Sequence, residues 1–219
     1  MNKGLLIVID GIDGSGKTTQ IDLLANYLSD RNIPYEVISF PQYGKNEYSK
    51  QIKDYLEGKL GRLEEVDPYF IAKAYASDRL TAKDLINSWL KEGKLIITNR
   101  YVSASKAHLG ANLPENDREN FMEWIDELEY QTNNMPKPDL NILLNVDPKV
   151  GQQNALKDHQ VDMHEESIEH EEKAAQIYFE LSQVEENWVV VDCMKNGQMK
   201  SEEKIQQEIV NLLSIRNLL

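Results

Sequence analysis

The sequence lacks most of the features that mark secreted, fibrous or membrane proteins. Its 219 residues include a single cysteine, Cys193, so no disulfide can form within the chain. The longest apolar run, residues 5–9, is far too short to cross a bilayer. No signal pattern precedes that run, and no stretch rich in proline or glycine divides the chain. We therefore expect one domain over residues 1–219, in a reducing, cytoplasmic setting and without a membrane partner.

Positive charge is scarce as well. Lysine and arginine total 24 against 37 aspartate and glutamate residues, which gives a net charge of -13. Proteins that bind nucleic acid through its phosphates need a positive surface, so this balance argues against a nucleic-acid partner. Any anionic ligand must instead meet a local cluster of donors. Hydrophobic residues make up 41% and charged residues 28%, as in an ordinary globular domain, which excludes a disordered or fibrous chain.

Apolar segments alternate with amphipathic ones along the chain. Residues 5–9 are continuously apolar, which is typical of a strand buried on both faces. Four more segments are mostly apolar and are interpreted as strands in the same way: residues 35–39, 95–98, 140–146 and 188–191. Strands that alternate with helices predict an α/β protein with a parallel sheet of about five strands and helices on both faces. The pattern leaves the order of the strands open.

Helical spacing of apolar residues lies between the strands. Asp67-Pro68 is typical of an N-cap followed by a first-turn proline, and the pattern behind it predicts one helix to about Lys91. Further helices are expected around the apolar positions within residues 21–28, 121–128, 168–181 and 205–212.

The sharpest motif is the segment 11–18, GIDGSGKT, which matches the phosphate-binding pattern G-x-x-x-x-G-K-[ST] without a mismatch. It follows a predicted strand and opens a predicted helix, as a phosphate loop requires. Lys17 would bridge the β- and γ-phosphates of a nucleotide, and Thr18 would bind Mg²⁺. The motif predicts a P-loop NTPase fold but does not by itself separate a kinase from a GTPase or a motor. The expected ATP-binding residues are Gly11, Ile12, Asp13, Gly14, Ser15, Gly16, Lys17, Thr18 and Thr19.

Other motifs follow the phosphate loop in a characteristic order. Asp13 lies two residues after its first glycine, and a lid-like stretch spans about residues 151–165. Between them come Phe40-Pro41, Asp78-Arg79, Asn99-Arg100-Tyr101, Ser103, Ser105, His108, Pro138-Asp139-Leu140 and Val146-Asp147-Pro148. With these motifs the chain resembles the thymidylate kinases, a family of P-loop nucleoside monophosphate kinases, over nearly its whole length.

The resemblance implies transfer of a phosphoryl group from ATP to dTMP, with Mg²⁺, by a homodimer. Arg100 follows a predicted strand, at the edge where open α/β sheets bind ligands, and a guanidinium suits a phosphate. The resemblance gives Arg100 the phosphate of dTMP and places Asp13 near both the acceptor and a metal-bound water. The further substrate-binding residues that it implies are Phe40, Pro41, Arg79, Tyr101, Ser105 and His108.

Several positions depart from the family pattern. Asn99 stands where an aspartate is usual, and Ala104 and Leu109 replace a serine and a glutamine. The stretch 151–165 contains no arginine, although a lid arginine usually serves relatives with a glycine at the Gly14 position. We expect Lys157 to supply the catalytic cation, with Arg118 as an alternative source. These departures leave open a kinase for another nucleoside monophosphate or a deoxynucleoside, or a weakly catalytic nucleotide-binding module.

Three further features have ordinary explanations: the histidines near residue 164, the glutamates that follow them and the lone cysteine. His159, His164 and His170 are spaced five and six residues apart, which does not fit one helix face, so no metal site is predicted. The glutamates between residues 165 and 172 are expected to form a solvated helix face. Cys193 is expected to be unreactive.

Overall fold

The computed structural model describes residues 3–63, 65–158, 164 and 167–219. A parallel sheet forms its centre, with the strand order β2-β3-β1-β4-β5. The five predicted strands are confirmed. They are β1 (Leu5–Asp10), β2 (Tyr35–Ser39), β3 (Leu95–Asn99), β4 (Leu140–Asn145) and β5 (Trp188–Asp192).

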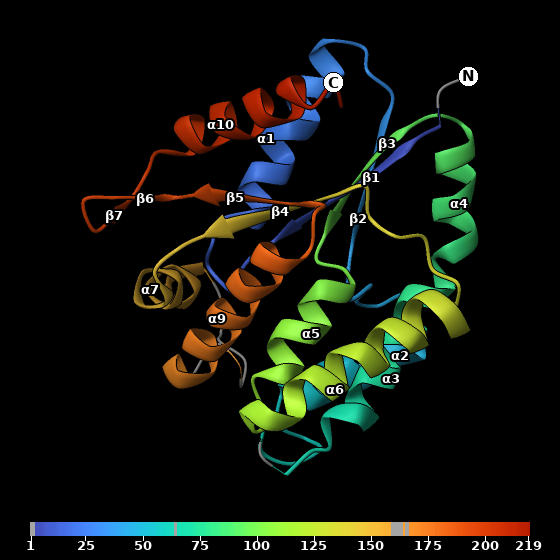
Figure 1. Ribbon diagram of the computed structural model, residues 1–219, viewed down its shortest axis with the longest axis vertical. Coiled ribbons are helices and arrows are strands. Elements are labelled where there is room, and N and C mark those ends of the chain that lie inside the picture. Colours follow the sequence, from blue (N-terminus) through green and yellow to red (C-terminus); the bar gives the residue numbers. More distant parts are fainter. Residues whose placement is uncertain (1–2, 64, 159–163, 165–166) are drawn as a thin grey trace.

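Helices cover both faces of this sheet, as predicted (Figure 1). On one face lie α1 (Lys17–Asp30) and α10 (Glu202–Ile215), which pack against each other. The other helices are α2 (Glu47–Leu56), α3 (Pro68–Thr81), α4 (Lys83–Lys91), α5 (Val102–Gly110), α6 (Glu115–Asp126) with a π-helical turn (Glu127–Thr132), α7 (Pro148–Asp158) and α9 (Ile168–Val184). The sequence pattern does not predict α2, α5, α7 or the small hairpin of β6 (Met194–Lys195) and β7 (Gln198–Met199).

The alternation of side chains along β1 divides the core into two halves. Leu6 and Val8 face the cluster under α2, α3, α4, α5 and α6, whereas Ile7 and Ile9 face the cluster under α1 and α10. Because successive residues of a strand point to opposite faces, a continuous apolar run is what a doubly covered strand needs.

The predicted single helix from Pro68 to about Lys91 is wrong, because the helix breaks at Ala82. The carbonyl of Asp78 accepts hydrogen bonds from Thr81 Oγ1 at 2.7 Å and from Gln42 Nε2 at 2.9 Å. These side chains occupy the acceptor that the Ala82 amide would use in a continuing helix. That amide bonds to the Arg79 carbonyl instead, so α3 ends at Thr81 and α4 begins one residue after Ala82.

The sheet brings the chemically important segments to one edge. In the parallel register, Asn99 at the end of β3 lies opposite Ile9 of β1 and Ser39 of β2. The phosphate loop, Phe40 and Arg100 continue directly from these strand ends. Within the described part of the chain, no helix is both long and apolar enough to span a membrane.

Candidate active site

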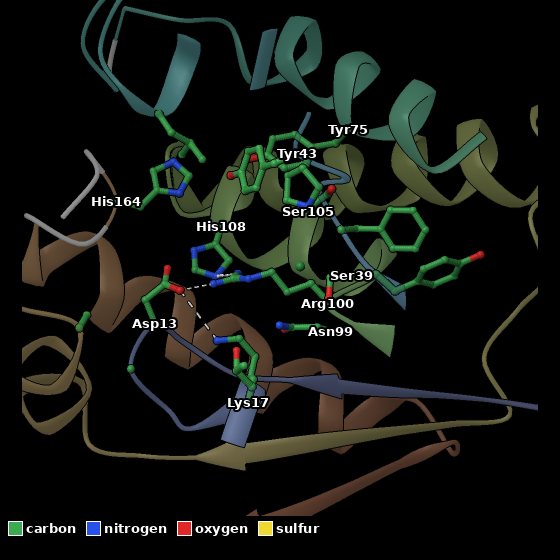
Figure 2. Close-up of a pocket in the computed structure, with 18 of the residues that line it drawn as sticks. Asp13, Lys17, Ser39, Tyr43, Tyr75, Asn99, Arg100, Ser105, His108 and His164 are labelled. Carbon is green, nitrogen blue, oxygen red and sulfur yellow. Dashed lines mark hydrogen bonds and ion pairs between the residues drawn. The ribbon is translucent and has the colours of Figure 1, made fainter. Parts of the chain in front are cut away.

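A pocket of about 640 Å³ lies at this edge of the sheet. The phosphate loop and the start of α1 form one wall, and residues that follow β2 and β3 form another (Figure 2). Side chains from α3 and α5 complete it. The predicted residues that line it are Asp13, Gly14, Gly16, Lys17, Thr18, Thr19, Phe40, Pro41, Arg79, Arg100, Tyr101, Ser105 and His108.

The glycines of the phosphate loop are required by its backbone. Gly14 and Gly16 have φ angles of 67° and 88°, in the left-handed region that favours glycine. A Cβ atom on Gly14 would also meet the carbonyl oxygen of Gly151 at 2.0 Å, so the start of α7 packs directly on the loop. Asn154, one turn along α7, donates to the Gly14 carbonyl at 3.3 Å. The loop and the segment predicted as a lid are therefore in contact.

Lys17 points into the loop that carries it. Its Nζ donates to the carbonyl oxygens of Gly11 at 3.0 Å and Ile12 at 2.7 Å, and it lies 3.8 Å from Asp13 Oδ1. Burial and the nearby charge of Arg100 lower the pKa of Lys17 to about 8. The Lys17 ammonium therefore loses its proton at a lower pH than an exposed lysine does.

Arg100 joins the loop to α5. Its backbone has a φ of 64°, which turns the chain sharply after β3. Its guanidinium donates to the Asp13 carboxylate and, at 2.6 Å, to Nε2 of His108 (Figure 2). Burial opposes ionisation of Asp13, but the charges of Arg100 and Lys17 outweigh it and hold the pKa of Asp13 well below its usual range. Two cations and one carboxylate therefore meet at the pocket, which leaves positive charge for an anionic ligand.

Arg79 forms the far wall and is 1% exposed. Its Nε and Nη2 donate to Glu129 Oε1 at 2.8 and 2.5 Å, and Nη2 also donates to Ser105 Oγ at 2.8 Å. A further bond runs from Nη1 to the Tyr101 carbonyl at 3.2 Å. These bonds fix the guanidinium in one orientation at the pocket.

The geometry agrees with what comparison with known proteins shows. A family model for thymidylate kinase matches residues 9–209. The chain belongs to the thymidylate kinase family. A probable thymidylate kinase of Methanosphaera stadtmanae is 30% identical over 213 residues, covering 96% of this chain and 100% of that protein. The thymidylate kinase of Mycobacterium tuberculosis is 30% identical over 142 residues, or 65% of this chain and 66% of the relative.

The fold is that of the family as well. The solved structure of thymidylate kinase from Candida albicans superposes with a TM-score of 0.78 at 21% identity, covering 98% of this chain and 93% of the other. The P-loop NTPase fold expected from the phosphate motif is thus confirmed.

Some predicted residues do not line the pocket. Gly11, Ile12 and Ser15 are buried within the loop behind it. Lys157, the expected lid cation, is an exposed residue of α7 and is not among the lining residues. Arg118 lies on α6 and donates to the Leu113 carbonyl at 3.3 Å, also away from the pocket lining.

Sequence reasoning missed several side chains of the site. Tyr43 and Tyr75 line the pocket together with Phe40, and both lie close to motifs that were recognised, Phe40-Pro41 and Asp78-Arg79. The carboxylate behind Arg79, Glu129, is fully buried. No pattern in the sequence connects it with a residue fifty positions away.

Glu171 corrects the expectation of a solvated glutamate face. It is 1% exposed, and its Oε2 accepts a hydrogen bond from the Asp13 amide at 3.2 Å. Burial, followed by the charge of Asp13, raises the pKa of Glu171 to about 8. The other described glutamates of the run, Glu169 and Glu172, are exposed as predicted.

The histidine spacing was also misleading. His164 and His170 stack with their ring centroids 4.2 Å apart, and His108 lies within 5.7 Å of both. They meet because α9 begins only at Ile168, so the spacing of a single helix does not govern His164. His159 lies outside the described residues. Cys193 is buried, and burial raises the pKa of its thiol to about 12, which agrees with an unreactive residue.

Proposed function

We propose that this protein transfers the γ-phosphoryl group of ATP to the phosphate of dTMP and releases ADP and dTDP. The observation that carries the proposal is the meeting of an intact phosphate loop with Arg100 in one pocket of a chain that belongs to this family. The loop would hold the donor, and Arg100 would hold the acceptor across from it. The test is whether release of ADP from ATP is stimulated by dTMP more strongly than by other acceptors.

The donor site would use the loop backbone and Lys17. Residues at the start of α1 line the pocket, and the free amides and dipole of a helix N-terminus attract phosphate oxygens. Lys17 would exchange the carbonyl oxygens of Gly11 and Ile12 for phosphate oxygens, and this contact would favour its charged form.

The residues present also fit a magnesium ion. Thr18 is exposed at the pocket, and Asn99 Oδ1 is buried there without a hydrogen-bond partner in the described part of the chain. Hydroxyl, amide and carboxylate oxygens are the ligands that Mg²⁺ accepts. We infer that Thr18 would bind the ion and that Asn99 and Asp13 would orient its waters. When bound, Mg²⁺ would neutralise charge on the transferred phosphates.

The acceptor would lie between Arg100 and Arg79. Arg100 would donate to its monophosphate, and Arg79, backed by Glu129, would present a donor to the base. Phe40 and Tyr75 offer aromatic surface for stacking, with Tyr101, Ser105 and His108 around it. No general base is needed, because the attacking phosphate oxygen is already anionic. The chain's contribution is positioning and charge neutralisation.

We propose that Lys157 reaches the transferred phosphoryl group when the segment 151–165 closes as a lid. Its side chain is exposed in this conformation, and α7 rests on the phosphate loop. Lys157→Ala should lower turnover, by up to about 10³-fold, more than it lowers acceptor affinity. Lys149 is an exposed lysine of the same helix, so Lys149→Ala is the matched control, and it should leave turnover unchanged. Equal rates for both variants would show that Lys157 is not the missing cation.

We further propose a homodimer formed through the long helices. Phe70 and Leu80 of α3 and Leu85 of α4 are 51%, 40% and 48% exposed, which is unusual for large apolar side chains on one pair of helices. A sedimentation mass of one chain at micromolar concentration would contradict this.

A further inference from the structure

Three histidines from separate parts of the chain form a buried cluster beside the pocket. His108 lies on α5, His170 lies on α9, and His164 precedes α9. One ring nitrogen of each lies within 4.8 Å of the others, and none of the three residues is more than 5% exposed. Figure 2 shows His108 and His164 on the same side of the pocket, next to Asp13 and Arg100.

Burial disfavours the charged form of all three imidazoles. Burial lowers the pKa of His170 to about 4 and those of His108 and His164 well below the ordinary range. A neutral imidazole keeps one nitrogen with a lone pair, which is the form that binds metal ions.

Hydrogen bonds orient two of the rings. His170 Nδ1 donates to Asn112 Oδ1 at 3.0 Å, so its lone pair is on Nε2, which is buried without a hydrogen-bond partner among the described residues. The Asn112 amide also donates to the Tyr55 hydroxyl at 3.2 Å, and that hydroxyl lies 3.1 Å from His164 Nε2. Such bonds to the other ring nitrogen are the usual support of metal-binding histidines.

His108 contributes a second buried nitrogen without a partner. Its Nε2 accepts from Arg100, so the neutral ring carries its proton on Nδ1, which makes no hydrogen bond to the residues that the structure describes. Leaving this buried N–H unsatisfied costs free energy, which weakens the preference for this tautomer. Binding a cation through Nδ1 would place the ring proton on Nε2, which could then no longer accept from Arg100.

We propose that His108, His164 and His170 bind one divalent transition-metal ion of the Zn²⁺ type. Three imidazoles with an open fourth position suit Zn²⁺ or Co²⁺, whereas Mg²⁺ prefers oxygen ligands. The rings are nearly parallel, with interplanar angles of 3° to 26°, so they must turn to bring their nitrogens to about 3.4 Å from one another around one ion. The cluster would then tie His164, at the end of the lid segment, to α5 and α9.

A second set of ligand atoms, from Asp13, His108 and Glu171, is equally compact but is less suited. The Asp13 carboxylate is held by Arg100, and Glu171 accepts from the Asp13 amide. Binding there would break both contacts.

The test measures metal binding directly and does not depend on turnover, so it is independent of the proposed kinase reaction. Full-length protein freed of metal with a chelator is titrated with Co²⁺ in excess Mg²⁺, followed by its visible absorption, and with Zn²⁺ by calorimetry. We expect one ion per chain with micromolar affinity and the intense visible band of four-coordinate Co²⁺. His170→Gln should weaken binding at least tenfold.

The matched control is His159→Gln, the one remaining histidine, which should bind like the wild type. Asn112→Ala keeps all three imidazoles and should weaken binding about tenfold by releasing their orientation, which provides a second variant if His170→Gln fails to fold. Absence of binding in the wild type, or equal affinity in wild type and His170→Gln, would overturn the proposal. So would a loss of affinity caused by His159→Gln alone.

Discussion

Arg79 keeps its charge in the interior because Glu129 lies against it. Both side chains are at most 2% exposed, and the carboxylate accepts two of the guanidinium's hydrogen bonds. Removing one member of a buried pair leaves the other charge without compensation, which costs more than the intact pair contributes.

Glu129→Gln should therefore lower the free energy of unfolding by about 3–5 kcal/mol, measured by urea denaturation. Acceptor affinity should fall with it, because Arg79 loses the partner that orients it. Glu169→Gln is the control, since its bond to Lys173 lies on the surface, and it should change stability little. An equally small effect of both substitutions would contradict the positioning role of Glu129.

Lys17 gives the nucleotide site a defined pH dependence. Its pKa of about 8 means that the cation is progressively lost in the nucleotide-free protein as the pH rises through 8. Bound phosphates favour the charged form, so ATP binding above that pH must take up a proton. ATP affinity should be constant below pH 7 and fall up to about tenfold per pH unit well above 8.

Calorimetry in buffers of different ionisation enthalpy measures this proton uptake. In Lys17→Arg the guanidinium stays protonated over this pH range. The variant should therefore show neither the proton uptake nor the fall in ATP affinity that deprotonation of Lys17 causes. If wild-type ATP affinity is the same at pH 7 and 9.5, the lowered pKa of Lys17 is wrong.

At the scale of elements, α7 is positioned by the absence of side chains at Gly14 and Gly151. A Cβ atom on Gly151 would meet the Asp13 carbonyl oxygen at 2.7 Å and Ile12 Cδ1 at 3.0 Å. Gly151→Ala should push α7 off the phosphate loop and lower turnover about 10²-fold, as misplacements of about 1 Å do.

Gly110→Ala on α5 is the matched control. Its Cβ atom would meet Ile177 Cδ1 at 3.5 Å and Met122 Cε at 3.7 Å, which are ordinary contacts. Both turnover and folding should survive this change. A Gly151→Ala variant with normal turnover would show that the contact between α7 and the loop is not needed for the reaction.

The elements also show what the sequence could and could not predict. Mostly apolar segments indicated all five strands, because a strand covered by helices on both faces buries side chains on both sides. The break at Ala82 depends partly on Gln42, forty residues earlier, and no local pattern reveals that contact. The site shows the same limit of local patterns. The phosphate loop is a local motif and could be predicted, whereas the positions of Glu171 and His164 depend on the packing of α9 against the loop and α5.

Although the molecule as a whole is acidic, three cationic side chains lie at one edge of its sheet. The net charge is -13, yet Lys17, Arg79 and Arg100 all line the same pocket. Strand order places the first two β–α connections beside β3, so residues far apart in the sequence converge there. This arrangement suits two phosphorylated ligands that must react with each other rather than with water.

The proposed reaction is tested by steady-state release of ADP from ATP and Mg²⁺, measured with and without dTMP and with the product identified. We expect strong stimulation by dTMP, with dTDP as product, and at least a tenfold preference for dTMP over other deoxynucleoside monophosphates and over thymidine. Lys17→Ala should reduce this rate by about 10³-fold without unfolding the protein. ATP binding without any stimulation by dTMP would contradict the account, and strong stimulation by a different acceptor would move the assignment to that acceptor.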